Sequence, residues 1–123
     1  MVYTSLSLPL AALETFVHLD PPDAPADLVS LSAEIPLTKE QLLHAQKEIL
    51  SRLPPQWKER SAAHTRQIGA EWAKSLRSVA LPVPSVVIDG EWNLLLNPQH
   101  PGMKQIVISK PKHFRFDERM FKR

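Results

Sequence analysis

Twelve prolines against three glycines constrain this chain of 123 residues more than any other feature of its sequence. Each proline fixes its own φ angle and biases the residue before it toward extended backbone. Prolines that lie between elements therefore predict stiff joints and not flexible linkers. The clustered ones are Pro21, Pro22, Pro54, Pro55, Pro82, Pro84, Pro98, Pro101 and Pro111. A chain of this length has room for a single domain with one core.

The Asp89-Gly90 pair lies between two apolar runs, a pattern that predicts a tight hairpin turn. We expect Ser85 and Asn97 at the far ends of the two paired strands, facing each other across the open end. Their hydroxyl and amide groups can meet a ligand there, beside a rigid sheet. The simpler interpretation is that both side chains only satisfy turn backbone, as serine and asparagine usually do.

Capping residues and apolar positions at helical spacing predict three helices. Ser7 is expected to cap the first, and a capping box at residues 38–41 begins the second. The third is expected from Thr65 until just before Pro82. Gly69 within it indicates that another element packs closely there. The apolar face of this third helix comprises Ile68, Trp72, Leu76 and Val79.

β-branched and aromatic residues, or an alternation of apolar and polar ones, predict further strands. These segments are residues 1–5, 28–35, 105–109 and 114–117. Because helices and strands intermingle and hairpins join antiparallel neighbours, the predicted fold class is α+β. We expect a single domain with a mixed, largely antiparallel sheet and flanking helices.

Glu14 borders the apolar face of the first predicted helix. It stands four residues from both Leu10 and His18, which places it at the edge of the buried face. A carboxylate in that position needs a partner. The simpler interpretation is a solvated glutamate that pairs with His18 on the helix surface.

The composition excludes several classes of function. A net charge of +2, without a block of like charges, gives no support for nucleic-acid binding. The absence of cysteine excludes disulfides and suits a cytoplasmic protein. Residues 1–19 are apolar but have no basic leader and contain Glu14, so we expect neither a signal peptide nor a membrane span.

The motifs of several common enzyme classes are absent as well. The sequence has no glycine-rich phosphate loop, no Gly-x-Ser-x-Gly elbow and no His-Glu-x-x-His pair. The five histidines lack the spacing of metal ligands, so we expect no metal site. A catalytic triad built on Ser85 is disfavoured because no glycine-supported oxyanion turn accompanies that serine.

Six blocks together resemble the RES domain family in their order and approximate spacing, from residue 1 to about residue 121. They are Tyr3-Thr4-Ser5, residues 10–19, residues 65–72, Val83-Pro84-Ser85, residues 93–101 and residues 114–119. The resemblance implies a RES-like domain over 1–123, with a fold similar to that of the ADP-ribosyltransferases. It also implies a bacterial toxin that consumes NAD and is paired with an Xre-like antitoxin protein.

The same resemblance assigns roles to individual residues. Glu14 and Ser85 match the family's catalytic glutamate and serine, and Tyr3, Ser85, Asn97 and His100 match positions implied to bind NAD. The implied reaction cleaves the nicotinamide-ribose bond and passes ADP-ribose to water, phosphate or a protein. The family arginine belongs to a segment that precedes the tyrosine strand, and no residue here matches it. We therefore expect an N-terminally incomplete domain.

That departure leaves a second hypothesis open. In this second hypothesis, the chain is a catalytically impaired RES remnant that binds the antitoxin or associates with itself as a homodimer. The two hypotheses differ in whether NAD is turned over.

Overall fold

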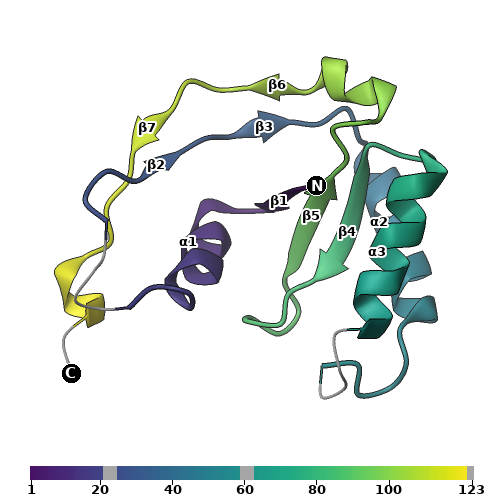
Figure 1. The fold of residues 1–123 in the computed structure, drawn as a ribbon, viewed down its shortest axis with the longest axis horizontal. Helices are drawn as coiled ribbons and strands as arrows, with labels where there is room; N and C mark the ends of the chain where they lie inside the picture. The colour runs from purple at the N-terminus through teal and green to yellow at the C-terminus, as the bar shows by residue number, and fades with distance from the viewer. Residues whose placement is uncertain (21–24, 59–62, 122–123) are drawn as a thin grey trace.

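The computed structural model describes residues 1–20, 25–58 and 63–121 (Figure 1). Its helices are α1 (Leu8–Phe16), α2 (Lys39–Arg52) and α3 (Ala63–Ser75), with 3-10 turns η2 (Pro101–Gln105) and η3 (Glu118–Phe121). Its strands are β1 (Val2–Ser5), β2 (Val29–Ser30), β3 (Ala33–Glu34), β4 (Ala80–Pro84), β5 (Trp92–Leu96), β6 (Val107–Ile108) and β7 (Lys112–His113). The α+β class is confirmed, and within the described residues no helix has the length and apolar character needed to cross a membrane.

The central sheet has the strand order β1-β5-β4, and both of its pairings are antiparallel. In Figure 1, α2 and α3 stand beside β4, whereas α1 lies on the β1 side. The short strands β2 and β3 pair with β7 and β6, also antiparallel, and form a long ribbon away from the central sheet. The predicted strand over residues 28–35 is therefore divided into two short ones.

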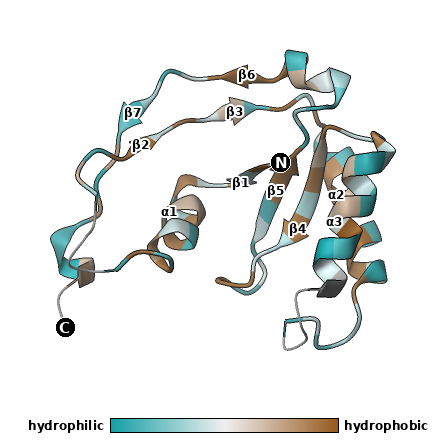
Figure 2. Cartoon of the chain, in the orientation of Figure 1, coloured by the Kyte–Doolittle hydropathy of each residue, from teal (hydrophilic) through white to brown (hydrophobic). Residues whose placement is uncertain are grey.

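The hydrophobic core is divided between the two faces of this sheet. Successive residues of a strand point to opposite faces, so Leu81 and its neighbour Ala80 belong to different clusters. One cluster comprises Ile49, Ile68, Trp72 and Leu81. The other comprises Ala80, Leu94, Leu96 and Ile106. Figure 2 shows the hydrophobic colour on β4 and β5, as this division requires.

Local sequence signals explain where the first two helices begin. The Ser7 hydroxyl accepts the N–H of Leu10 at 3.3 Å and so caps α1. Thr38 and Gln41 form the expected capping box, in which each side chain accepts the other residue's backbone N–H. Both predicted helix starts are confirmed.

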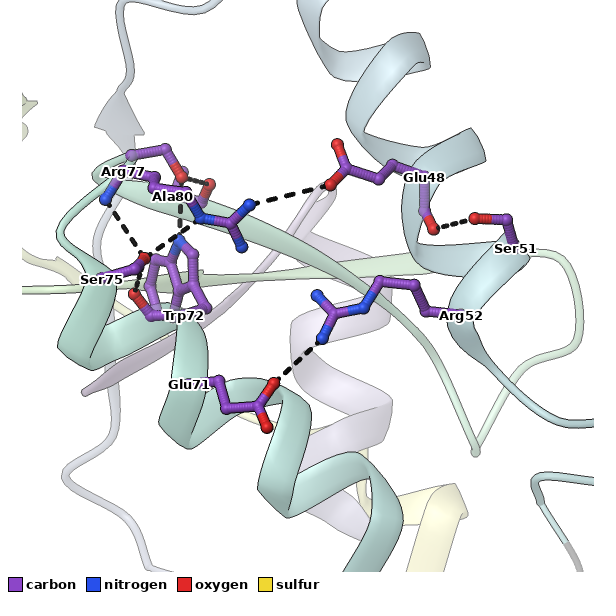
Figure 3. Close-up of polar contacts among 9 residues, drawn as sticks. Glu48, Ser51, Arg52, Glu71, Trp72, Ser75, Arg77 and Ala80 are labelled. Atoms are coloured by element: carbon purple, nitrogen blue, oxygen red, sulfur yellow. Dashed lines mark hydrogen bonds and ion pairs between the residues drawn. The ribbon is translucent and has the colours of Figure 1, made fainter.

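α3 ends at Ser75, earlier than its apolar spacing predicts. Leu76 takes a left-handed φ of 53° and its side chain is 47% exposed, so it leaves the apolar face of the helix. Trp72, by contrast, is buried, and its indole N–H donates to the Ser78 hydroxyl at 2.8 Å. Figure 3 shows this junction, where Arg52 of α2 reaches Glu71 of α3 at 3.2 Å.

The C-terminal segment packs on α1 through aromatic rings. Phe16 of α1 lies 5.6 Å from Phe116 and 5.4 Å from Phe121 between ring centroids, and Phe114 meets Phe116 edge to face at 5.0 Å. The predicted strand over residues 114–117 is wrong, because the paired strand is β7, which precedes it. The aromatic alternation reflects packing on a helix and not pairing in a sheet.

The predicted antiparallel hairpin forms, and the Glu91 N–H donates to the Ile88 carbonyl across Asp89-Gly90 at 3.3 Å. The predicted tight turn is wrong, because β4 ends at Pro84 and residues 85–91 connect it to β5. Ser85 adjoins the turn, because its N–H donates to the Glu91 carbonyl at 2.8 Å, whereas the Asn97 N–H donates to the Val79 carbonyl at the open end. The expected meeting of Ser85 and Asn97 is therefore wrong. The physical reason is that the Ser85 hydroxyl accepts the N–H groups of the two residues that follow Val86, which turns the chain out of the sheet.

Candidate functional site

Glu14 lies on α1 with its carboxylate directed at the central sheet. Its Oε1 accepts a hydrogen bond from the Ser85 hydroxyl at 2.8 Å and another from Asn93 Nδ2 at 2.7 Å. The predicted position at the edge of the buried face is confirmed, since Glu14 is half-buried. His18 is exposed, and the partners of Glu14 come from β5 and the turn after β4 instead.

The second carboxylate oxygen of Glu14 is available to a ligand. Among the residues that the structure describes, none donates a hydrogen bond to Oε2. No buried side-chain oxygen in that part of the chain lacks a partner, so Oε2 must reach solvent. One oxygen is thus fixed by two donors, while the other has contact with solvent and no hydrogen-bond donor among the described residues.

Asn93 is the hub of this polar cluster, and its side chain is fully buried with 0% exposure. Its Nδ2 donates to Glu14 and lies 3.3 Å from the Tyr3 hydroxyl, while its Oδ1 accepts from the Ser5 hydroxyl at 2.6 Å. A carboxylate only accepts hydrogen bonds, so the amide nitrogen must face Glu14. Sequence reasoning missed this residue, although a polar amide at the start of a leucine-rich strand was a visible signal.

Ser85 is saturated by its protein contacts. Its single proton goes to Glu14, and its oxygen accepts the N–H groups of Val87 at 3.1 Å and Ile88 at 3.0 Å. With 1% exposure it offers no free lone pair or surface to a ligand. Its geometry therefore orients Glu14 and gives no support to a triad with a histidine.

Tyr3 connects the cluster to the molecular surface. It lies on the same face of the sheet as Ser5 and Asn93, because β1 pairs Tyr3 with Leu95 and Ser5 with Asn93. Burial of the hydroxyl raises the pKa of Tyr3, and the negative charge of Glu14 raises it further. The phenol consequently stays protonated and able to donate at neutral pH.

Asn97 and His100 lie at the other end of β5, away from Glu14. Asn97 donates from Nδ2 to the Ala73 carbonyl at 3.0 Å and accepts the Gln99 N–H at 3.0 Å. His100 accepts the Gly102 N–H on Nδ1 at 2.9 Å and caps η2. The bond to Ala73 fastens the end of α3 to the end of β5, whereas the bonds to Gln99 and Gly102 are local. The structure does not bring Asn97 and His100 together with Glu14 and Ser85.

No three His, Cys, Asp or Glu side chains gather in a metal-binding arrangement within the described ranges.

Comparison with known proteins places this arrangement in context. The RES domain family model matches residues 1–117. The chain is 36% identical over 124 residues to a Prs ADP-ribosylating toxin of Sphingobium sp. (strain YBL2), covering 100% of this chain and 76% of that protein. It is also 36% identical to proteins named Toxin Res from Yersinia enterocolitica, over 97% of this chain and 76% of that protein, and Pseudomonas putida, over 98% and 79%.

Proposed function

Since this chain belongs to the RES domain family, we propose that it is a bacterial toxin that consumes NAD by breaking the nicotinamide-ribose bond. The observation that carries the proposal is the Glu14 carboxylate, with Oε1 held by Ser85 and Asn93 and Oε2 open. The name of the Sphingobium relative supports NAD as the substrate, because ADP-ribosylation takes its ADP-ribose from NAD.

The reaction requires stabilisation of a positive charge on the ribose. As the C–N bond breaks, its electron pair leaves with nicotinamide, and the sugar passes through an oxocarbenium-like state, as in glycoside cleavage. Glu14 Oε2 is proposed to accept a ribose hydroxyl proton in a hydrogen bond and to stabilise the cation electrostatically. The acceptor, which is water, phosphate or a protein group, then bonds to the ribose carbon and loses a proton.

The neighbours of Glu14 are proposed to act through it. Two fixed donors remove most of the rotational freedom of the carboxylate, so its orientation is set before substrate arrives. Ser85 and Asn93 are therefore positioning residues. Tyr3 is proposed to contact NAD directly, since the residue is 59% exposed while its hydroxyl lies 3.3 Å from Asn93 Nδ2.

The proposed biological setting follows from the toxin names of the relatives. A toxin that consumes a central metabolite requires an antitoxin partner, for which we propose an Xre-like protein, and the cytoplasm is the proposed location because NAD is used there. Asn97 and His100 are proposed to contribute to the NAD site indirectly, Asn97 by joining α3 to the end of β5 and His100 by capping η2.

Incubation of the purified chain with NAD, with nicotinamide release as the readout, tests the proposal. Glu14→Gln keeps the size of the side chain and removes its charge, so we expect release to fall at least a hundredfold, about 2.7 kcal/mol of transition-state stabilisation. Glu34→Gln, on the exposed strand β3, is the matched control and should release nicotinamide normally. Failure of the folded wild-type chain to release nicotinamide would favour the non-catalytic, antitoxin-binding or self-associating alternative.

A further inference from the structure

A cavity of about 470 Å³ opens on the face of the central sheet that also carries Tyr3 and Asn93. Its walls are mainly apolar and come from α2, α3, the segment after α2 and the sheet. They include Ile49, Leu53, Trp57, Ile68, Leu81 and Leu95. Its volume falls in the range of small-molecule sites, which are typically about 300–1,000 Å³ and largely apolar.

Gly69 lies in the wall of this cavity, in the middle of α3. Glycine is the least favourable residue for a helix interior apart from proline, so its presence there needs a reason. The close packing predicted from the sequence is not that reason, because a Cβ built on Gly69 meets no heavy atom within 4 Å. The missing side chain leaves space that no neighbouring group fills.

The cavity adjoins the Glu14 cluster. Tyr3 belongs to both, since it lines the cavity and its hydroxyl lies 3.3 Å from Asn93 Nδ2. Pro84 and Val86, the two residues that flank Ser85, line the cavity as well. A molecule seated in the cavity therefore lies beside the residues that hold the carboxylate.

We infer that this cavity receives the nicotinamide ring of NAD and that Gly69 keeps the space for it, an inference that rests on the proposed function. The ring attached to the reacting ribose has to lie next to the carbon that Glu14 is proposed to stabilise, and the cavity adjoins the cluster at Tyr3. A flat aromatic ring suits walls that include Tyr3 and Trp57.

The apolar character of the cavity also fits the direction of the reaction. The nicotinamide ring carries a positive charge in NAD and is neutral once its bond to ribose has broken. Apolar surroundings disfavour a charged group, and the Arg66 side chain in the cavity wall adds like-charge repulsion. The cavity thus holds the leaving group more favourably than the intact substrate, which is the condition for accelerating the bond-breaking step.

Free nicotinamide, followed by calorimetry or ligand-observed NMR, is the probe for this site. We expect Gly69→Leu to weaken nicotinamide binding by about tenfold or more, because the new side chain occupies the cavity. Ala70→Leu places the same side chain on the exposed side of the same helix and should bind as the wild type does. Leucine is a strong helix former, only slightly less favourable than alanine and much more so than glycine, so far-ultraviolet circular dichroism should show folded proteins for both variants.

Two outcomes would overturn the inference: undetectable nicotinamide binding by the wild-type chain, or equal affinities for Gly69→Leu and wild type. If Gly69→Leu perturbs the fold, Gly69→Ala adds one methyl group to the same space, and a several-fold loss of affinity is then the expected result. Glu14→Gln separates this inference from the proposed function. That variant should bind nicotinamide normally, while its release of nicotinamide from NAD falls at least a hundredfold.

Discussion

Asn93 Nδ2 donates to Glu14 Oε1 at 2.7 Å and joins β5 to α1 across 79 positions of the chain. The bond orients the carboxylate, and because Asn93 also bonds Ser5, it ties that orientation to the pairing of β1 with β5. A change at Asn93 is therefore transmitted to Glu14 without any contact with a substrate.

Replacement of Asn93 by leucine keeps the approximate shape of the side chain and removes both bonding groups. We expect the free energy of unfolding to fall by about 1–3 kcal/mol, because the Ser5 hydroxyl and Glu14 lose buried partners. Nicotinamide release should also fall under conditions in which the variant is fully folded. The loss of stability then does not explain the loss of activity. Urea denaturation and an NAD assay on the same preparation provide the two measurements.

Asn97→Leu is the matched comparison for that change. It removes the bonds to Ala73 and Gln99 at the other end of β5, so a similar loss of stability is expected. Turnover of NAD by the folded fraction should remain close to that of the wild type. A loss of turnover as large as that of Asn93→Leu would show that Asn97 contributes directly to the site.

Ser85→Ala tests whether the serine positions Glu14 or holds substrate. The hydroxyl is buried and saturated, so its loss should lower kcat by about tenfold to a hundredfold while KM changes little. Steady-state kinetics with varied NAD separate the two parameters. A rise in KM at unchanged kcat would instead identify Ser85 as a ligand contact.

Tyr3 is the only tyrosine in the chain, so its ionisation can be followed directly by near-ultraviolet absorbance. We expect a pKa above the ordinary value near 10, owing first to burial and then to Glu14. Glu14→Gln should lower the midpoint without restoring the ordinary value, because the contribution of burial remains. An identical midpoint in the variant would contradict the proximity of the two side chains.

The same titration has a consequence for stability. Above about pH 10 the unfolded chain loses the tyrosine proton while the folded chain retains it, so the folded state binds more protons. The contribution of Tyr3 to the free energy of unfolding is constant below that pH. It falls as the pH rises from there through the folded-state pKa. Tyr3→Phe should abolish that part of the alkaline loss in denaturation curves.

Leu76→Gly tests the backbone at the end of α3. Leu76 has a φ of 53°, a conformation that costs a non-glycine residue about 1–2 kcal/mol and costs glycine little. Part of the gain is offset by the greater freedom of glycine in the unfolded chain, so a net stabilisation of about 1 kcal/mol is expected. A lower midpoint of urea denaturation would show that the partly exposed leucine side chain contributes more than the backbone strain costs.

Signals that depend on neighbouring residues could be read from the sequence. The cap at Ser7, the box at Thr38 and the turn at Asp89-Gly90 each satisfy local backbone groups, and all three are present in the structure. The helical spacing of apolar residues predicts that α3 continues to Val79. That prediction is wrong because the left-handed backbone at Leu76 ends the helix.

The site was less accessible to sequence reasoning because its bonds are long-range. The need of Glu14 for a partner follows from its place on a helix, but the identity of Asn93 as that partner depends on how α1 docks on the sheet. Ser85 was predicted at the wrong end of its strand because its bonds to Val87 and Ile88 bend the chain before Asp89. The local pattern indicated that serine as a polar strand end, and the family resemblance assigned it a catalytic role.

The pairing of β1 with β5 links Thr4 to Leu94, which are 90 positions apart. Contacts of such high sequence separation slow folding, since the entropy of closing a long loop opposes them. During synthesis, Glu14 emerges from the ribosome long before Asn93 does. On the proposed function, the nascent chain cannot assemble its carboxylate site until β5 is free to fold, which leaves an interval in which an antitoxin can meet the chain before the chain becomes harmful.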